Sequence, residues 1–370
     1  MRVQRVVAPS SGAVSYTVVN EAFSPVEPAE AYLAHLSAIE RSPNTVRAYA
    51  SSLKLFFAHL EARSVAFEDV RIDDVGRFVS ALRAPAPGVI VIDACASRRA
   101  ESTVNRHLAA VFGLYEFHAR RGVAVADELV SWRRGGRGSY KPFLDGVGGR
   151  ARRVARRPVR LREGRKLPKT LTAAEITTLL GACVHLRDRF LFGLLAETGM
   201  RVGQALGLRH EDFVSREQTV RIVPRTDNVN GARTKCRDAA EIPVSPGLVR
   251  AYSEYLFAEY GEVNSDYVFV NLFAPPLGRP MRYSAVAGLV DRLVASTGIE
   301  FNLHMLRHSF ASGMIREGVP IEVVSKLLTH RSVATTSGTY VHLGVEELRG
   351  ALQRARVANE AVTDHARSLR

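Results

Sequence analysis

Residues 303–340 read LHMLRHSFASGMIREGVPIEVVSKLLTHRSVATTSGTY, near the end of a chain of 370 residues. The spacing of apolar residues predicts two successive helices, the second over PIEVVSKLLTH. A polar segment without a strong amphipathic pattern follows, beginning at His330 and ending at Tyr340. Taken alone, Tyr340 is compatible with a surface residue, a half-buried aromatic residue or a nucleophile, and the half-buried aromatic is the ordinary interpretation.

The first of these helices carries two histidines and an arginine. His304 and Arg307 are three residues apart, so both side chains can share one helix face, and His308 lies one turn beyond His304. Zinc binding is one alternative for such a pair of histidines. The chain has no HExxH glutamate and no cysteine cluster, which disfavours a metal site. A core histidine beside a surface arginine is the other alternative.

Upstream, TGMRVGQALGLR (198–209) follows the nearly all-apolar RDRFLFGLLAETG, for which we predict a buried helix. Arg201 therefore lies after a Thr-Gly turn next to buried structure. Its guanidinium cannot lose its charge, so it should face an anion or an acidic partner. A structural salt bridge is an equally good interpretation of Arg201 alone.

Between these two regions, TVRIV (219–223) and AEIPV (240–244) predict two short strands. Asn230–Gly231 between them is a hairpin signal, and Lys235 lies where the chain leaves the predicted turn. A solvated loop lysine is the ordinary interpretation of Lys235. Before them, Thr172 and Glu175 have the spacing of a capping box at a helix start.

The N-terminal part has a helical pattern. SPNTVRAYASSLKLFFAHL (42–60) places apolar residues at steps of three and four, with Ser42 as the predicted N-cap and Pro43 at the first helical position. EPAEAYLAHLSAIE and STVNRHLAAVFGLYEFHARRG predict two more helices. Arg106 and His107 flank the apolar face of the last one, where they can meet phosphates or form a solvated helix side.

The segment 131–166 separates these two parts. It is glycine-rich and holds thirteen Lys/Arg against Asp145 and Glu163, a net charge of +11 out of +14 for the whole chain. We interpret it as a basic linker rather than a core element. A disordered tail that adds only nonspecific affinity is the alternative. The sequence pI of about 10.1 indicates a polyanionic partner, most simply nucleic acid.

Composition limits the remaining classes. The length suggests two domains, and 46% apolar residues are ample for packed cores. No apolar stretch is long enough to predict a membrane span, and the N-terminus does not resemble a signal peptide. The three cysteines, Cys95, Cys183 and Cys236, are widely spaced, so we expect free thiols and a cytoplasmic location.

Together these motifs resemble the tyrosine recombinase family, the phage integrase-like enzymes, over about residues 28–345. Within that family, the sequence most resembles integrase-type transposases of site-specific transposons. ETGMRVGQALGL resembles the first arginine box, LHMLRHSFAS the H-x-x-R box, and KLLTHRSVATTSGTYVHL the segment that carries the nucleophile. The catalytic residues it implies are Arg201, Lys235, His304, Arg307, His330 and Tyr340.

Three features depart from the family pattern. Gln204 occupies a place where the family often has glutamate or aspartate, and Thr329 replaces the glycine before the third-box histidine. The spacing from His330 to Tyr340 is ten, where nine is common, so the Ser337–Gly338 turn would have to absorb one residue.

The resemblance implies a mainly α fold with a small antiparallel β-sheet, in which a helical core-binding domain and a mixed α/β catalytic domain clamp DNA. The expected division of the chain is an N-terminal extension (1–26), a helical SAM-like core-binding domain (27–130), the basic linker (131–166), the catalytic domain (167–350) and a C-terminal helical tail (351–370). The DNA-binding residues expected from it are Asn44, Thr45, Arg47, Arg106, His107, Arg152, Arg153, Arg156 and Arg157.

The implied chemistry needs no metal and no cofactor. Two arginines neutralise the phosphate, Tyr340 attacks phosphorus to form a 3′-phosphotyrosyl ester, and His304 takes the phenol proton. Lys235, on a mobile hairpin, protonates the leaving 5′-oxygen, and His330 hydrogen-bonds the phosphate.

The expected partners are double-stranded DNA, further copies of the chain in a tetramer on paired sites, and accessory transposition proteins, with no membrane. The C-terminal tail docks either on a neighbouring protomer or on its own domain. Three rival functions remain: a non-catalytic DNA-binding protein, a type IB topoisomerase-like enzyme, and RNA binding through the linker.

Overall fold

The computed structural model describes residues 1–7, 12, 14–84, 99–134, 153–156, 158–164, 168–234, 238–329 and 336, with only the main chain at 131–134 and 153–156. The chain divides into two compact units, Met1–Arg165 and Lys166–Arg370. Predictions on Ser337–Gly338 and on the C-terminal tail lie outside the described residues. No helix among the described residues is both long enough and apolar enough to cross a membrane.

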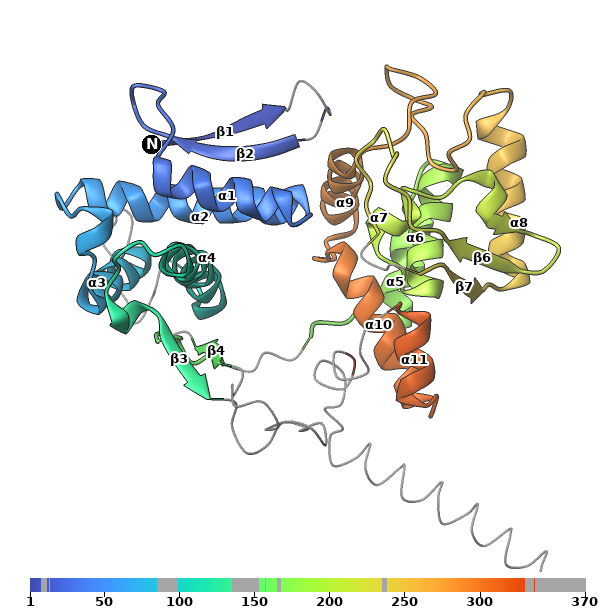
Figure 1. Ribbon diagram of the computed structural model, residues 1–370. Coiled ribbons are helices and arrows are strands. Elements are labelled where there is room, and N and C mark those ends of the chain that lie inside the picture. The colour runs from blue at the N-terminus through green and yellow to red at the C-terminus, as the bar shows by residue number, and fades with distance from the viewer. Residues whose placement is uncertain are drawn as a thin grey trace, which may run out of the picture. The chain divides into compact units, whose positions relative to one another are not determined.

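Helices dominate the first unit (Figure 1). They are α1 (Glu27–Ala38), α2 (Pro43–Glu61), α3 (Ile72–Arg83) and α4 (Glu101–Arg120), with 3-10 turns at Phe67–Asp69 and Asp127–Leu129. The Ser42 side chain accepts a hydrogen bond from the Thr45 backbone, which confirms the predicted cap of α2. The predicted apolar faces of α2 and α4 meet in a core centred on Phe56 and Tyr115, which are fully buried.

The N-terminal extension folds into an antiparallel pair, β1 (Arg2–Val7) and β2 (Val14–Val19). The pair packs on α2, and Val18 joins the helical core. The predicted linker likewise contains two paired strands, β3 (Ser131–Arg134) and β4 (Arg153–Arg156). No strand was predicted in either place.

Residues 158–164, at the end of the predicted linker, lie against the first unit. The buried Asn105 side chain of α4 donates to the Leu161 carbonyl oxygen and the Glu163 carboxylate and accepts from the Leu161 backbone N–H, at 2.7–2.9 Å. Val159 and Leu161 pack against the first core. Much of the segment that we interpreted as a linker is therefore part of the first unit.

The second unit is built around α6 (Leu186–Thr198), which lies between α8 (Pro246–Tyr255) and α10 (Leu303–Arg316). The other helices are α5 (Ala173–Gly181), α7 (Val202–Ala205), α9 (Tyr283–Thr297) and α11 (Ile321–Leu327), with a 3-10 turn at His210–Asp212 and a π-helical turn at Leu256–Tyr260. The capping box of Thr172 and Glu175 at α5 is confirmed.

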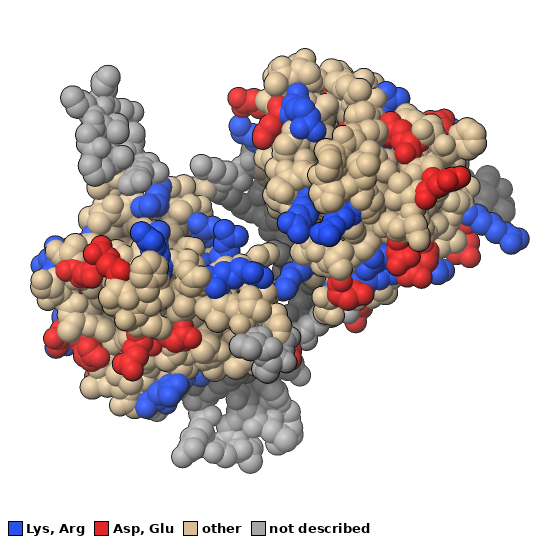
Figure 2. Space-filling view, turned by 90° about the horizontal axis from the view of Figure 1, so that it is seen from above, with Lys and Arg blue, Asp and Glu red and all other residues tan. Residues whose placement is uncertain are grey.

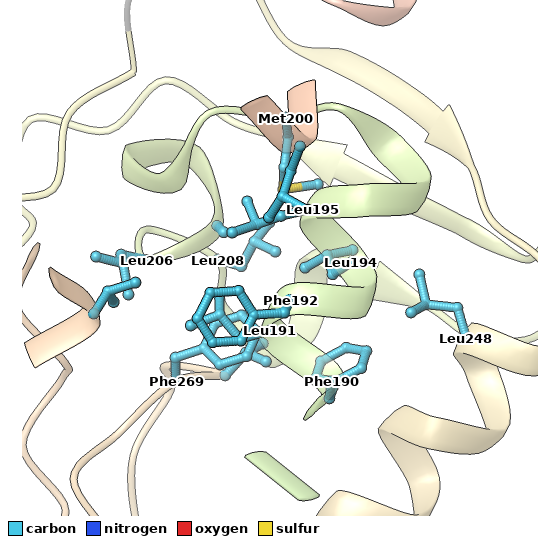
Figure 3. Packing of buried hydrophobic residues seen from close by; sticks show 14 of the residues in the cluster. Phe190, Leu191, Phe192, Leu194, Leu195, Met200, Leu206, Leu208, Leu248 and Phe269 are labelled. Carbon is cyan, nitrogen blue, oxygen red and sulfur yellow. The ribbon is translucent and has the colours of Figure 1, made fainter. Parts of the chain in front are cut away.

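The prediction of a buried helix is confirmed at α6. Its side chains Phe190, Leu191, Leu194 and Leu195 are almost completely buried and pack against Phe269, Leu248 and Met200 (Figure 3). Burying each large apolar side chain stabilises the fold by about 1.5–3 kcal/mol. This rigid helix carries the turn that leads into Arg201.

A three-stranded antiparallel sheet completes the unit, in the order β5 (Phe213–Val214), β6 (Thr219–Ile222) and β7 (Ala240–Pro243). The two predicted strands pair as expected, and β5 was not predicted. The predicted turn forms at Asn230–Gly231, where Gly231 has φ +73°. It lies inside a long connection between β6 and β7 rather than in a tight hairpin.

Candidate active site

The turn after α6 positions Arg201. Gly199 ends the helix with φ +60°, a left-handed conformation that glycine adopts readily. A Cβ atom at Gly199 would lie 2.4 Å from Cδ1 of Phe310 and 3.0 Å from Cδ2 of Leu328, so no larger residue fits this place. Arg201 then becomes the N-cap of α7, with its side chain half-buried.

Arg307 of α10 is buried, with 3% of its surface exposed. Its two terminal nitrogens donate to the carbonyl oxygens of Gly199 and Leu328, both at 2.6 Å. The first of these oxygens lies two residues before Arg201, and the second belongs to the C-cap of α11. Arg307 therefore joins the α6–α7 turn to the end of α11 and brings the two predicted arginines together.

Arg201 also contacts the end of α11. Its Nη1 donates to the Thr329 hydroxyl at 3.3 Å, and the buried Gln204 side chain donates to the same hydroxyl at 2.9 Å. Thr329 has φ +51°. The two residues that depart from the family pattern are thus in direct contact with each other and with Arg201, which the sequence alone did not indicate.

His304 is exposed in the first turn of α10, where the Asn302 side chain accepts from the backbone N–H groups of His304 and Met305. The ring of His308 lies 6.1 Å away. Burial first, and then the nearby His304 and Arg307, lower the pKa of His308 below its usual 6.5. His308 therefore stays neutral at physiological pH, and His304 is the more exposed of the two histidines.

The described part of the connection that leads to Lys235 is held in place by hydrogen bonds and a close contact with α7. The Asn230 side chain donates to the carbonyl oxygens of Leu206 and Met281 at 2.9 and 2.8 Å. A Cβ atom on Gly203 of α7 would lie 2.7 Å from the Arg233 carbonyl oxygen. The chain therefore passes close to α7 just before Lys235, rather than leaving the unit as a free hairpin.

Lys235, His330 and Tyr340 lie outside the described residues, and their roles stay predictions. Within the polar segment 330–340 only Thr336 is described, and its side chain is completely buried. Among the described residues, no group of three or more His, Cys, Asp or Glu side chains could hold a metal ion.

In the first unit, Asn44 and Arg47 are exposed near the start of α2, Thr45 is half-buried there, and the Arg47 guanidinium lies 5.9 Å from the centre of the Tyr16 ring. Arg106 is exposed on α4. Of the four linker arginines, Arg152 and Arg157 lie outside the described residues, and Arg153 and Arg156 form the two ends of β4, of which only the main chain is described.

His107 has a different environment from the other residues predicted to bind DNA. It is 6% exposed, and its Nδ1 lies 2.9 Å from the Ser52 hydroxyl of α2. Burial, and then the charges of Arg106 and Arg99, lower the pKa of His107 from 6.5 to about 4. The neutral imidazole carries no positive charge for a phosphate and is held by Ser52 between α2 and α4, so we leave His107 out of the DNA interface proposed below.

Sequence reasoning missed three residues that build the site: Gly199, Asn230 and Asn302. The signals were present as a Thr-Gly pair after an apolar helix, an Asn-Gly turn and an asparagine before a helix start. Each predicted local geometry, but none indicated which distant carbonyl or side chain it would meet.

Comparison with known proteins agrees with this arrangement. The phage integrase family matches residues 169–347, and the phage integrase N-terminal SAM-like domain matches residues 29–122. Transposase A from transposon Tn554 of Staphylococcus aureus is 35% identical over 96% of this chain and 98% of its own length. Tyrosine recombinase XerD of Mycobacterium tuberculosis is 30% identical, over 88% and 97%.

Solved structures show the same fold. The Tn1549 transposon integrase in complex with a circular intermediate DNA matches with a TM-score of 0.60 at 14% identity, over 87% of this chain and 98% of that one. The XerH site-specific recombinase in a post-cleavage complex matches with a TM-score of 0.58 at 20% identity, over 84% and 79%. The clustered arginines, the two matched domains and the nearly full-length transposase relative together show that the chain belongs to the phage integrase family of tyrosine recombinases.

Proposed function

We propose that this tyrosine recombinase cuts and rejoins double-stranded DNA at specific sites through a 3′-phosphotyrosyl intermediate on Tyr340, and thereby integrates or excises a mobile element. The observation that carries the proposal is the pair of hydrogen bonds from Arg307 to Gly199 and Leu328, because they bring Arg307 and Arg201 together beside the exposed His304.

The two arginines would neutralise the negative charge of the phosphodiester, which otherwise hinders attack on phosphorus. A guanidinium stays charged and presents five donors, so two bonds to carbonyl oxygens do not exhaust Arg307. Donors fixed in advance stabilise the charge that develops in the transition state better than water does. Arg201 and Arg307 together would hold the non-bridging oxygens of the scissile phosphate.

In the covalent step one bond to phosphorus forms and another breaks, and one proton is transferred at each of the two oxygens. The phenol oxygen of Tyr340 bonds to phosphorus, and the bond from phosphorus to the 5′-oxygen breaks. His304 accepts the phenol proton, Lys235 donates a proton to the departing 5′-oxygen, and His330 hydrogen-bonds the phosphate. The ester keeps the energy for rejoining, so a 5′-hydroxyl of another strand can reverse the step without ATP or a metal ion.

The DNA interface proposed for the first unit consists of Asn44, Thr45 and Arg47 on α2 and Arg106 on α4. Figure 2 shows groups of Lys and Arg side chains on both units, some of them beside Asp and Glu. The linker arginines Arg152, Arg153, Arg156 and Arg157 would add phosphate contacts as the two domains clamp the duplex. Such contacts position the DNA without reading its sequence.

The transposase relative supports the link to a mobile element, since its similarity extends over nearly the whole chain. Exchange of four strand ends requires several copies, so we propose a tetramer on paired sites in the cytoplasm, with accessory transposition proteins. The proposed division is a core-binding domain over 27–130, the basic linker over 131–166 and a catalytic domain over 167–350. The segments 1–26 and 351–370 flank these domains. The C-terminal segment, 351–370, docks either on the catalytic domain of a neighbouring copy or on that of its own chain.

A suicide substrate tests the reaction. Double-stranded DNA with the element's end sequence and a nick beside the cut site is incubated with the protein and separated on a denaturing gel. The wild type should give a covalent adduct and Tyr340→Phe none, while both bind the DNA equally well. An adduct that persists in Tyr340→Phe would refute the nucleophile, and DNA binding without any adduct would favour a non-catalytic binding protein.

Two further arms address the other rivals. Relaxation of supercoiled plasmid by a monomer, without joining of two sites, would favour a topoisomerase-like enzyme. Preference for RNA over DNA of the same sequence would favour RNA binding. Cleavage that stops after removal of divalent cations with EDTA would contradict the metal-free scheme.

A further inference from the structure

The contact between Gln204 and Thr329 unites the two places where the site departs from its family's pattern. Gln204 is 2% exposed and lies on α7, whereas Thr329 follows the C-cap of α11. Gln204 Nε2 lies 2.9 Å from the Thr329 hydroxyl oxygen, and Arg201 Nη1 lies 3.3 Å from the same oxygen. The hydroxyl is thus shared between a neutral amide and the arginine proposed to hold the phosphate.

The main chain determines how the amide is oriented. The backbone N–H of Arg201, which can only donate, lies 2.7 Å from Oε1 of Gln204. The opposite end of the amide is therefore the NH₂ group, and it donates to Thr329. Because Arg201 donates to this hydroxyl as well, the hydroxyl acts as acceptor for both groups.

The backbone of Thr329 is strained, so having threonine rather than glycine at this position costs conformational energy. Its φ of +51° is left-handed, which is strained for a β-branched residue and free of strain for glycine. The residue therefore loses conformational energy that glycine would not lose. Its hydroxyl bonds to Arg201 and Gln204 are the described interactions that glycine could not supply.

We propose that Gln204 and Thr329 form a positioning pair, in which an amide and a hydroxyl hold the Arg201 guanidinium and fix the start of the segment that carries His330. This role rests on the proposed function of Arg201. The pair touches neither the substrate nor the reacting atoms. Because both members are neutral, Arg201 keeps its full positive charge for the phosphate, whereas a carboxylate at 204 would offset part of it.

Substitutions at Thr329 separate positioning from stability. Thr329→Gly removes the hydroxyl that accepts from Gln204 and Arg201, which lowers stability, and also relieves the backbone strain, which raises it; stability should therefore change little while the single-turnover rate of adduct formation falls about ten-fold. Thr329→Ser keeps the hydroxyl and should stay within about three-fold of the wild-type rate. DNA affinity should change less than about two-fold in both, since few phosphate contacts change.

Gln218→Gly is the matched control. Gln218 is exposed, has φ +51° and lies in the turn between β5 and β6. Its replacement relieves the same kind of strain away from the site, so stability should rise slightly and the cleavage rate should not change.

A double substitution tests whether the two residues act as one unit. Gln204→Glu alone should slow adduct formation about ten-fold, because the carboxylate offsets the charge of Arg201 while the threonine side chain keeps its place. In Gln204→Glu/Thr329→Gly the carboxylate can bond the guanidinium directly in the space that the threonine leaves, which restores the position of Arg201 but not its full charge, so the slowing in Gln204→Glu remains and the slowing in Thr329→Gly is relieved. The reduction in rate in the double variant should therefore be smaller than the product of the two single reductions. Its rate should lie within about three-fold of that of the faster single variant.

Either of the following results would overturn the proposed pair: Thr329→Gly cleaving at the wild-type rate, or single effects that simply multiply in the double variant. A Thr329→Ser variant as slow as Thr329→Gly would also overturn it. These results presuppose an adduct from the wild type. No wild-type adduct on the correct DNA would instead overturn the proposed function of the site, and the positioning pair with it.

Discussion

Helices α4 and α10 each bury polar side chains, but in different chemical states. In α4 two of the buried groups, Asn105 and His107, are neutral, and their described partners are main-chain and side-chain groups of the same unit. In α10 the buried group is the charged Arg307, whose described partners are carbonyl oxygens. The exposed His304 lies one turn before it.

This difference separates a structural role from a functional one. A neutral group whose hydrogen bonds are satisfied inside the protein stabilises the fold and offers nothing to a ligand. A guanidinium is costly to bury, and carbonyl oxygens offset that cost without removing its charge. We therefore infer that Asn105 and His107 of α4 tie their unit together, while Arg307 of α10 keeps a positive charge in place for a substrate.

Arg307→Ala should have the largest effect. It removes the proposed phosphate contact and the donors to two buried carbonyl oxygens, so adduct formation should fall at least about 10³-fold. The free energy of unfolding should fall by about 2–4 kcal/mol. Single-turnover cleavage and urea denaturation measure the two effects. Arg307→Lys keeps the charge but cannot span both oxygens, and recovery of stability by lysine would contradict the role of the paired bonds.

The buried histidine of α4 should make the first unit sensitive to acid. A histidine with a pKa of about 4 in the folded chain and 6.5 in the unfolded chain binds protons more tightly when unfolded. Stability present above pH 6.5 is therefore lost as the pH falls toward 4, by about 3 kcal/mol in total. Urea denaturation followed by circular dichroism at a series of pH values measures this loss.

His107→Gln is the control for that measurement, since glutamine stays neutral at every pH. The pKa of His59 in α2 is also lowered, so some pH dependence should remain in the variant. Wild-type and variant curves that run parallel between pH 6.5 and pH 4 would show that His107 does not titrate as expected.

Asn105→Ala should have a moderate effect confined to the first unit. It removes three hydrogen bonds to Leu161 and Glu163 and should lower the free energy of unfolding by about 2 kcal/mol. Residues 158–164 should then become sensitive to limited proteolysis. The rate of adduct formation at saturating DNA should not change, and a large loss of that rate would contradict a purely structural role for Asn105.

Arg106→Ala should have the smallest effect. Arg106 is exposed, so stability should not change, while loss of one phosphate contact should reduce the slope of log affinity against log salt by about 0.9. Arg120→Ala is the matched control on the same helix, because Arg120 is paired with Glu116. Equal salt slopes in the two variants would remove Arg106 from the proposed interface.

Local patterns predicted most helices and their ends, because caps and apolar periodicity depend on neighbouring residues. The buried α6, the Ser42 cap and the capping box at Thr172 are of this kind. His107 shows the limit of such reasoning. It flanks the apolar face of α4, and only the packing of α2 decides that it lies inside rather than in water.

The resemblance to tyrosine recombinases named the site residues, but the sequence could not show how they are held. The contact between Gln204 and Thr329 joins residues 125 positions apart, and no periodicity reports it. The strands β1 and β2 and the attachment of residues 158–164 likewise depend on tertiary packing. Lys235, His330 and Tyr340 remain predictions from the motifs.

The bonds that hold the two arginines also set the order in which the site can form. Arg307 and Gly199 are 108 residues apart, and Thr329 and Arg201 are 128 apart. Contacts at such separations form late, after the intervening chain has lost much of its freedom. A nascent chain that has emerged only to the end of α10 lacks the Leu328 carbonyl and the Thr329 hydroxyl. The arrangement that we propose for the scissile phosphate is therefore completed only after Thr329 has been synthesised, and proteolysis just after Leu327 would abolish it.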